Sequence, residues 1–245
     1  SGLSSDTPLL IGPAVKADLT VALAAPKISH VLPPAEEYVG ELRIVGIGIP
    51  EALFEDAALR RSFVGRGDVA PFLAKRKRDT HKGTYGHVLV LAGSRGKSGA
   101  ATLAGRAALR MGAGLVTLGT PAGCLAAIAR ATPELMVEPL PETAEGTLAE
   151  SAAKRILELA RVKDALLIGP GLSTHPSTAK MMAEVLPELE VPVVIDADGL
   201  NIIAADPALL GRLRAPAVLT PHPGEFARLT GLSTKDVLEK RLDLA

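Results

Sequence analysis

The feature that most constrains the fold of this chain is a repeated alternation of short apolar runs with longer Ala- and Leu-rich stretches. The apolar runs predict strands over residues 87–93, 114–119, 165–171, 191–196 and 215–220. The other stretches have helical spacing and predict helices over residues 100–111, 151–162, 178–189 and 233–245. Strands that alternate with helices form βαβ units, in which the strands are parallel. The sequence therefore predicts an α/β fold with a mostly parallel sheet flanked by helices.

The composition excludes several classes of partner. Hydrophobic residues make up 47% of the chain but aromatic residues only 2%, so few rings are available to stack on bases. Lys and Arg together number 27, as do Asp and Glu, which leaves no basic footprint for nucleic acid. The single Cys124 excludes an intrachain disulfide, and no apolar run reaches the roughly 18 residues of a membrane helix. We expect a cytoplasmic protein with no nucleic-acid or membrane partner.

The pattern divides the chain into three parts. Residues 1–50 precede a charged, poorly patterned connector over residues 51–79, and the regular alternation occupies residues 80–245. The run Lys75–Arg78 is interpreted as part of a solvated linker. The chain has no initiator Met, and its last helix has no return strand after it. We therefore expect a fragment of a longer protein whose sheet is incomplete at the C-terminus.

Five loops at one edge of the predicted sheet form a candidate ligand site. In open parallel sheets, ligands bind outside the carboxyl ends of the strands. Each predicted strand ends there in small or functional residues, namely Gly93–Ser94, Gly119–Thr120, Gly169–Gly171, Asp196–Gly199 and Thr220–Glu225. The clustering of these loops is more informative than any one of them.

Glycines at the edge allow two interpretations. Residues 93–98 look like a phosphate-binding loop, but Leu91 stands where the Walker pattern needs its first glycine. The backbone N–H groups of Gly99, Ala100 and Ala101 remain candidates for holding an anion or an amide, and close helix packing explains these residues equally well. Lys97 is given a packing role. Gly171 also has two interpretations: it allows a ligand to approach the backbone closely, or it only serves an ordinary tight turn between strand and helix.

Acidic residues and a histidine complete the candidates. Asp198 is interpreted first as the cap of the helix Gly199–Ala204, which leaves Asp196 as the more open functional residue, suited to Mg²⁺ or to phosphate-linked water. His222 and Glu225 lie in a segment stiffened by proline and glycine. A rigid segment holds an imidazole in one orientation, so we favour a binding role over a solvent-facing histidine with a capping Glu225.

Six motifs, in this order, resemble those of the NAD(P)H-hydrate dehydratase family, whose members are relatives of ribokinase. They are His81–Val90, Gly93–Ala100, Gly112–Val116, Gly169–Leu172, Asp196–Asn201 and Thr220–Phe226. A second series resembles the closing part of an NAD(P)H-hydrate epimerase domain, and with it a Rossmann-like remnant. That series is Ser1–Leu3, Asp6–Thr7, Ala17–Val21, Ala25–Lys27 and Tyr38–Leu42. The order of the two series is that of a fused bifunctional repair enzyme.

The resemblance implies a ribokinase-like fold and a hydro-lyase that uses ADP or ATP with Mg²⁺ to dehydrate the hydrates of NADH and NADPH. It implies substrate contacts at Gly99, Ala100, Ala101, Gly171, Thr220, His222, Gly224, Glu225 and Phe226, with Asp196, Asp198 and Asn201 as secondary candidates. The catalytic Asp and the nucleotide strand of the family are expected after Ala245. Ser1 would lie beside an epimerase K⁺ site, and we expect a homo-oligomer for the full-length protein.

Two alternatives stay open. A ribokinase-like kinase of a vitamin precursor or sugar shares the fold, and a fold alone does not determine a function. The second alternative is a fragment that binds ligand without catalysing a reaction.

Overall fold

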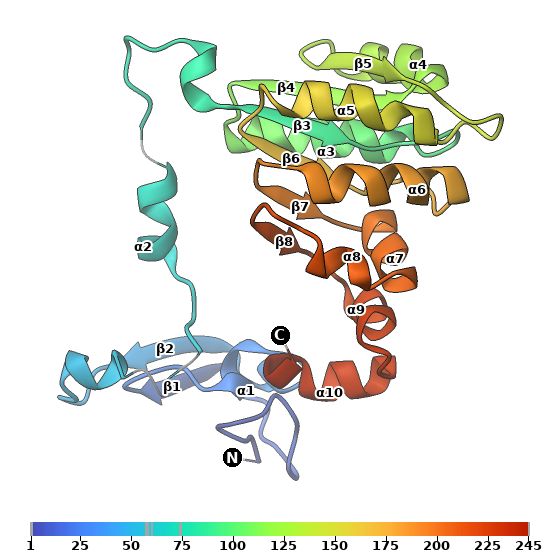
Figure 1. The fold of residues 1–245 in the computed structure, drawn as a ribbon. Coiled ribbons are helices and arrows are strands. Elements are labelled where there is room, and N and C mark those ends of the chain that lie inside the picture. Colours follow the sequence, from blue (N-terminus) through green and yellow to red (C-terminus); the bar gives the residue numbers. More distant parts are fainter. Residues whose placement is uncertain (1, 57–58, 60, 74, 245) are drawn as a thin grey trace. The chain divides into compact units, whose positions relative to one another are not determined.

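The computed structural model describes residues 2–56, 59, 61–73 and 75–244, and the chain forms two compact units, Ser1–Arg76 and Lys77–Ala245. Figure 1 shows the elements of both units along the chain.

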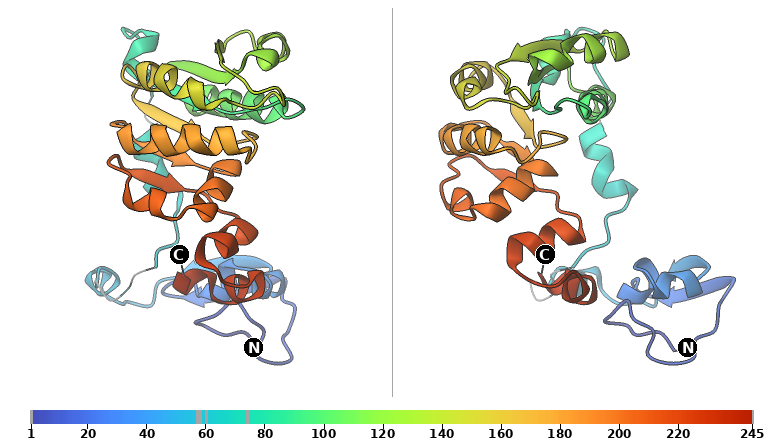
Figure 2. Two further views of the ribbon diagram at one scale, coloured as in Figure 1. Left: turned by 45° about the vertical axis from the view of Figure 1, so that its right-hand side comes forward. Right: turned by 90° about the vertical axis from the view of Figure 1, so that its right-hand side faces the viewer.

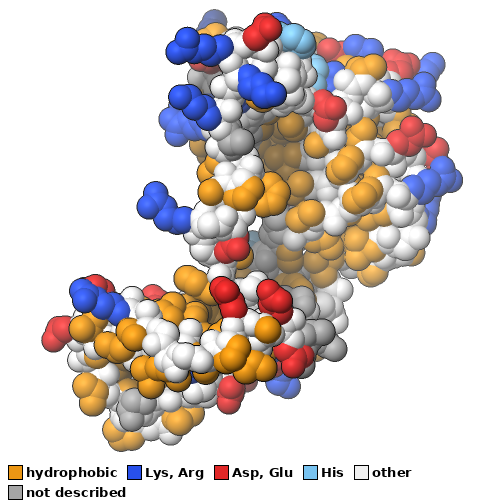
Figure 3. Space-filling view, turned by 90° about the vertical axis from the view of Figure 1, so that its left-hand side faces the viewer, with side chains coloured by type: hydrophobic (Ala, Val, Ile, Leu, Met, Phe, Trp, Pro, Cys, Tyr) orange, Lys and Arg blue, Asp and Glu red, His pale blue; other side chains and the backbone are white. Residues whose placement is uncertain are grey.

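Unit 1 contains two parallel strands, β1 (Leu19–Leu23) and β2 (Glu41–Val45). Its short helical turns are α1 (Ile28–Val31), η1 (Ala35–Tyr38), η2 (Glu51–Phe54), α2 (Arg66–Val69) and η3 (Ala70–Leu73). Apolar side chains stay exposed on both strands, including those of Val21 and Ile44, and many are visible on this unit in Figure 3. Two parallel strands do not test the epimerase or Rossmann-like interpretation, which stays a prediction.

Unit 2 is built on a parallel sheet, as the sequence predicted. Among its described residues the sheet has six strands in the order β5–β4–β3–β6–β7–β8. The strands are β3 (His87–Leu91), β4 (Leu115–Pro121), β5 (Met136–Leu140), β6 (Ala165–Ile168), β7 (Val193–Ile195) and β8 (Ala217–Leu219). The sequence interpretation missed β5, where Glu138 and Pro139 interrupt the apolar pattern. β5 is an edge strand, and an edge is where a sheet tolerates proline.

Helices cover both faces of this sheet (Figure 2). The longer ones are α3 (Ser98–Met111), α4 (Leu125–Ala131), α5 (Ala153–Ala160), α6 (Pro176–Val185), α7 (Asp198–Ala205), α9 (Pro223–Thr230) and α10 (Thr234–Leu244). The short turns are η4 (Lys82–Tyr85), η5 (Ala122–Cys124), η6 (Glu150–Ala152), η7 (Leu186–Glu188) and α8 (Ala208–Gly211). The predicted stop of α3 at Gly112 is confirmed, because this glycine adopts the left-handed conformation that ends helices.

Side chains that point alternately to the two faces of the sheet form two hydrophobic cores, one on each face. Leu89 and Leu91 of β3 belong to the larger cluster, which includes apolar side chains of α5, α6 and α7. Val90 belongs to the other cluster, with Ala101 of α3 and Ile128 of α4. Because neighbouring residues of a strand point to opposite faces, a continuous apolar run such as Val88–Leu91 is buried on both sides.

The strand order places a topological switch point at β3. The chain runs outward from β3 to β4 and β5, and then returns to β6 on the other side of β3. The segments that follow β3 and β6 therefore leave the sheet toward opposite faces and open a crevice between them, which is where α/β sheets bind ligands. Among the described residues, every helix is too short or too polar to cross a bilayer.

Candidate functional site

The candidate site lies at the carboxyl ends of β3, β6, β7 and β8, an edge that we call the rim. It comprises residues 93–101 after β3, residues 169–173 after β6, residues 196–201 after β7 and residues 220–226 after β8. All four strands are parallel and adjacent, so these segments leave the same edge of the sheet. Hydrogen bonds connect each segment to its neighbour.

The segments after β3 and β6 are joined at the switch point. The buried Ser94 hydroxyl donates to the carbonyl oxygen of Gly171 at 2.8 Å. The amide N–H of Gly93 donates to the carbonyl oxygen of Pro170 at 2.9 Å. A hydrogen bond of this kind contributes about 1 kcal/mol net. The two bonds fix the position of the Gly171 backbone relative to the start of α3.

Gly171 is a glycine for steric reasons. Its φ is +68°, and a Cβ placed on it would lie 3.0 Å from the Cβ of Ala100 and 3.2 Å from the carbonyl oxygen of Lys97. The structure thus brings Gly171 against the Gly99–Ala101 turn. Gly99 and Ala100 stay partly or fully exposed, whereas Ala101 is buried below them. Whether a ligand contacts these backbones stays a prediction.

The segment after β7 differs from its predicted form. Asp198 is the first residue of α7 and does not cap it, so the capping interpretation is wrong. Its Oδ2 atom instead accepts the N–H of Ser173 at 2.8 Å and lies 3.1 Å from the Nζ atom of Lys97. Lys97, predicted to have a packing role, thus forms an ion pair across the crevice. Ala197 between the two aspartates has φ 51° and ψ −120°, a strained conformation for a residue with a Cβ.

Residues after β8 are tied to the same network. The Thr220 hydroxyl donates to Oδ1 of Asp196 at 2.8 Å. His222 is the N-cap of α9, and its Nδ1 atom accepts the N–H groups of Gly224 at 3.0 Å and Glu225 at 3.3 Å. Accepting at Nδ1 places the proton of the neutral ring on Nε2. The imidazole is oriented by the helix and remains 61% exposed.

Glu225 contacts both the backbone and the ring of His222. Its buried carboxylate accepts the N–H of His222 at 2.9 Å, and its Oε1 atom lies 3.3 Å from Nε2 of the ring. Both capping contacts that competed with a binding role are therefore present. They do not exclude that role, because they hold an exposed imidazole in one orientation.

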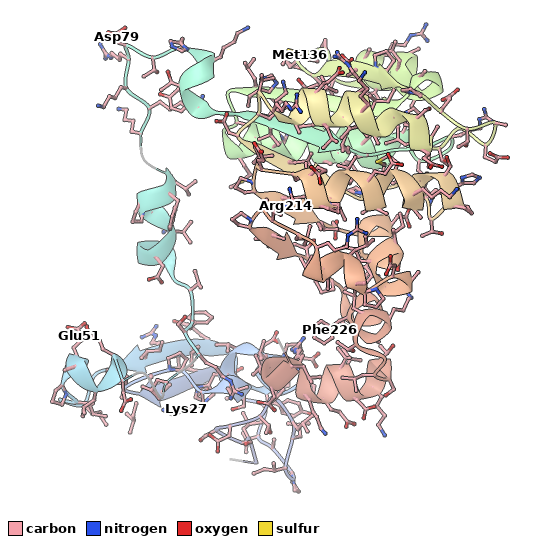
Figure 4. The ribbon with its side chains drawn as sticks, viewed as in Figure 1. Lys27, Glu51, Asp79, Met136, Arg214 and Phe226 are labelled. Atoms are coloured by element: carbon pink, nitrogen blue, oxygen red, sulfur yellow. The ribbon has the colours of Figure 1, made fainter. Side chains whose placement is uncertain are left out.

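The remaining predicted residues lie on helices rather than in loops. Pro223 starts α9, so Gly224, Glu225 and Phe226 belong to its first turn, and Figure 4 marks Phe226 on this helix. Asn201 lies in α7, where its Oδ1 accepts a hydrogen bond from Arg228 at 2.5 Å. This bond joins α7 to α9.

Three residues of the rim network were missed as site residues by the sequence interpretation. Ser94 and Ser173 follow the glycines of two strand ends, and Lys97 precedes α3. A serine directly after a strand-end glycine was an available signal for Ser94. Ser173 acts through its backbone N–H, and Lys97 through a carboxylate 101 positions away, so their roles have no local signal.

Cys124, close to the end of β4, has a packing role. It is buried, and burial raises the pKa of its thiol above the usual range, so the thiol stays protonated. It packs in the cluster that contains Ile128.

Other features of unit 2 lie away from the rim. Two cavities, of 130 Å³ and 530 Å³, border segments that precede strands, at the opposite edge of the sheet. Among the described residues, no group of three or more His, Cys, Asp and Glu side chains is arranged to hold a metal ion. Ser1, predicted to lie beside a K⁺ site, is outside the described residues.

The fold and rim define the class of protein. A ribokinase-like superfamily protein from Enterococcus faecalis matches 69% of this chain and 58% of its own length with a TM-score of 0.55, at 22% identity. A crystal structure of ADP/ATP-dependent NAD(P)H-hydrate dehydratase from Bacillus subtilis, co-crystallised with ATP and Mg²⁺, matches 73% of this chain and 59% of its own length, with a TM-score of 0.58 and 32% identity. Unit 2 thus has a ribokinase-like α/β fold, and the predicted fold class is confirmed.

Sequence comparison identifies the family. The model of the NAD(P)H-hydrate dehydratase family matches residues 88–245. The chain belongs to this family. A bifunctional NAD(P)H-hydrate repair enzyme of Moorella thermoacetica is 43% identical over 245 residues, which are 100% of this chain and 46% of that protein. The chain therefore spans about half the length of the curated relatives it matches.

Proposed function

We propose that this chain forms the hydrate-binding part of an ADP- or ATP-dependent NAD(P)H-hydrate dehydratase, a lyase that returns hydrated NADH and NADPH to the intact dihydropyridines. The observation that carries the proposal is the bonded rim at the switch point, in a chain that belongs to the dehydratase family. The named activity of the Bacillus subtilis neighbour supports the same reaction.

The reaction is an elimination. A C–O bond of the hydrated ring breaks, a proton leaves the adjacent carbon, and a C=C bond forms. In the full-length protein, the hydroxyl would become a leaving group by accepting a phosphoryl group from ADP or ATP, so that inorganic phosphate leaves with the C–O bond electrons and the nucleotide is left one phosphoryl group shorter. The residues of this chain bind and orient the ring, and we assign no catalytic base among them.

Backbone atoms carry most of the proposed recognition. Gly99 lies in the first turn of α3, a position where backbone N–H groups attract polar or anionic ligand groups, whereas the N–H of Ala100 already donates to the carbonyl oxygen of Lys97 at 3.1 Å. Gly171 has no side chain, so the ligand approaches its backbone closely. The oriented imidazole of His222 closes the other end of the rim. A nearly rigid frame of this kind favours the reaction by fixing the substrate geometry.

The described residues do not form a Mg²⁺ site. None of their His, Cys, Asp and Glu side chains come together in a group of three or more, and the carboxylates of Asp196 and Asp198 each already accept a hydrogen bond, from Thr220 and Ser173. We therefore place no step of the reaction on Mg²⁺ held by these carboxylates. That a relative was co-crystallised with ATP and Mg²⁺ supports a requirement for both in the full-length protein.

Further proposals concern the full-length protein. Because the Moorella thermoacetica protein matches the whole chain, residues 1–50 are proposed to belong to an epimerase domain with K⁺ near Ser1. Residues 51–79 then connect it to the dehydratase domain that begins at residue 80. Cytoplasmic location and homo-oligomeric assembly are proposed for the full-length protein.

The test uses the full-length gene product with hydrated NADPH and ADP or ATP, and follows recovery of the dihydropyridine absorbance. We expect nucleotide-dependent recovery. Phosphorylation of a hydroxymethyl pyrimidine or a thiazole, with the hydrate left untouched, would instead identify a vitamin-precursor kinase and overturn the proposal.

Two substitutions separate the capping role of His222 from its proposed ligand role. His222→Asn keeps a good N-cap, whereas His222→Ala removes it and costs about 1 kcal/mol of stability. Both variants are expected to raise the KM for the hydrate. A KM that changes only in the less stable alanine variant would assign His222 to capping alone.

A further inference from the structure

The carboxylate of Asp198 is the point at which three segments of the rim meet. Asp198 itself follows β7, its Oδ2 atom accepts the N–H of Ser173 after β6 at 2.8 Å, and the same atom lies 3.1 Å from Nζ of Lys97 after β3. The carboxylate is only 19% exposed, and the Lys97 side chain is 52% exposed. An exposed lysine in an ion pair contributes little to stability, so the geometric effect of the contact is the larger one.

The two partners of Asp198 stand next to the proposed ligand contacts. Ser173 is two residues after Gly171, and Lys97 is two residues before Gly99. A Cβ on Gly171 would lie 3.2 Å from the Cβ of Lys97, so the two segments already touch. Moving Asp198 therefore releases the backbone of Gly171 on one side and the start of α3 on the other.

The backbone before Asp198 independently indicates a constrained position. Ala197 has φ 51° and ψ −120°, which a residue with a Cβ keeps only when its surroundings fix it. The hydrogen bond from Thr220 to Asp196 fixes one side of this turn, and the bonds of Asp198 fix the other. Strained backbone of this kind concentrates at functional sites.

We propose that Asp198 is a positioning residue of the hydrate site, which sets the spacing between the Gly171 backbone and the start of α3. The inference rests on the proposed function. Asp198 contacts neither substrate nor reacting atoms in this role, and it acts through Ser173 and Lys97.

The test compares variants of the full-length gene product. Asp198→Ala is expected to raise the KM for the hydrate by about 10- to 100-fold, because misplacing a binding frame by about 1 Å has effects of this size. Asp198→Asn retains an oxygen for the Ser173 N–H and should recover part of the loss. Lys97→Met leaves that bond intact and should have the smallest effect. The KM for ADP or ATP is expected to stay unchanged in all three.

A matched control is available on the edge strand β5. Glu138 pairs with Arg155 at 2.7 Å, and its side chain is similarly shielded, at 29% exposed. Glu138→Gln removes this pair away from the rim and should leave the KM for the hydrate unchanged. A merely structural Asp198 would lower the melting temperature of its variants without a selective change of that KM.

Hydrogen exchange gives a second readout that does not need turnover. Asp198→Ala and Asp198→Asn should increase amide exchange in residues 169–173 and 93–101, and Glu138→Gln should not. Unchanged exchange there overturns the inference, as does an active Asp198→Ala enzyme with the wild-type KM for the hydrate. A wild-type protein that leaves the hydrate untouched refutes the proposed function, and exchange alone then decides whether Asp198 couples the segments.

Discussion

Replacing Gly171 with alanine tests the steric basis of the rim, and Gly231 provides a matched control. Both glycines have left-handed backbones, with φ of +68° and +74°. An alanine in this conformation costs about 1–2 kcal/mol at either position. At Gly231 no atom lies within 4 Å of the added Cβ, whereas at Gly171 the Cβ would meet Ala100 at 3.0 Å and Lys97 at 3.2 Å.

The contact at Gly171 adds an overpacking cost of about 1–3 kcal/mol. We therefore expect Gly171→Ala to lower the free energy of unfolding by about 2–5 kcal/mol and Gly231→Ala by about 1–2 kcal/mol. The gain from a stiffer unfolded chain is common to both alanines and cancels in the comparison. In a protein of this size each kcal/mol corresponds to about 2–4 °C in melting temperature.

The assay is urea unfolding followed by circular dichroism, with the KM for the hydrate measured on the folded variants. Gly171→Ala should raise that KM and Gly231→Ala should not. Equal losses of stability in the two variants, within about 0.5 kcal/mol, would refute the close packing of Gly171 against the start of α3.

Three further substitutions probe strain, protonation and the core. Ala197→Gly should raise the free energy of unfolding by about 1 kcal/mol, because relief of backbone strain exceeds the added entropy of the unfolded chain; a lower urea midpoint contradicts this. Burial, with a smaller effect of the Lys163 ammonium, lowers the pKa of His87, so the unfolded chain binds a proton at higher pH than the folded chain does. The wild type should therefore lose stability as the pH falls below about 6.5, and His87→Gln should lose less; equal pH slopes in unfolding titrations argue against this contribution. Leu89→Ala should cost about 2–5 kcal/mol because Leu89 is fully buried, whereas Leu103→Ala, at an exposed position, should cost under about 0.5 kcal/mol; similar melting temperatures for the two variants contradict the core assignment.

Local patterns carried most of the fold. Gly112 ends α3 and Pro176 begins α6, and both positions follow rules that depend on a few neighbouring residues. The runs at β3 and β6 are apolar throughout because parallel strands are buried on both faces. β5 could not be identified in this way, because its edge position relaxes the burial that creates an apolar pattern.

The candidate site was less predictable than the fold. That the segments of Gly171 and of α3 leave the same edge of the sheet follows from parallel strands, but their direct contact depends on the pairing of β3 with β6, which the sequence did not reveal. The partners of Asp198 do not follow, because a carboxylate at a helix start satisfies the local rule for a cap equally well. Only the tertiary arrangement shows that the Asp198 carboxylate binds Ser173 and Lys97 and not the N–H groups of its own helix.

This difference has a physical origin in the way in which we propose that the rim recognises its ligand. Gly99, Ala100 and Gly171 offer backbone atoms, and a backbone atom is placed by its loop rather than by its own side chain. Only Gly171 among them lacks room for a Cβ, which would meet Ala100 and Lys97, and small residues of this kind leave no chemical signature in the sequence. The charged side chains of Asp198 and Lys97 do not contact the ligand in this proposal. They hold the loops that carry these backbone atoms at a fixed spacing. Substitutions at these charged positions should therefore change affinity through geometry, with the loops shifted and their composition intact, and a Cβ added at Gly171 should change it by displacing the start of α3, whose atoms it would meet at 3.0–3.2 Å.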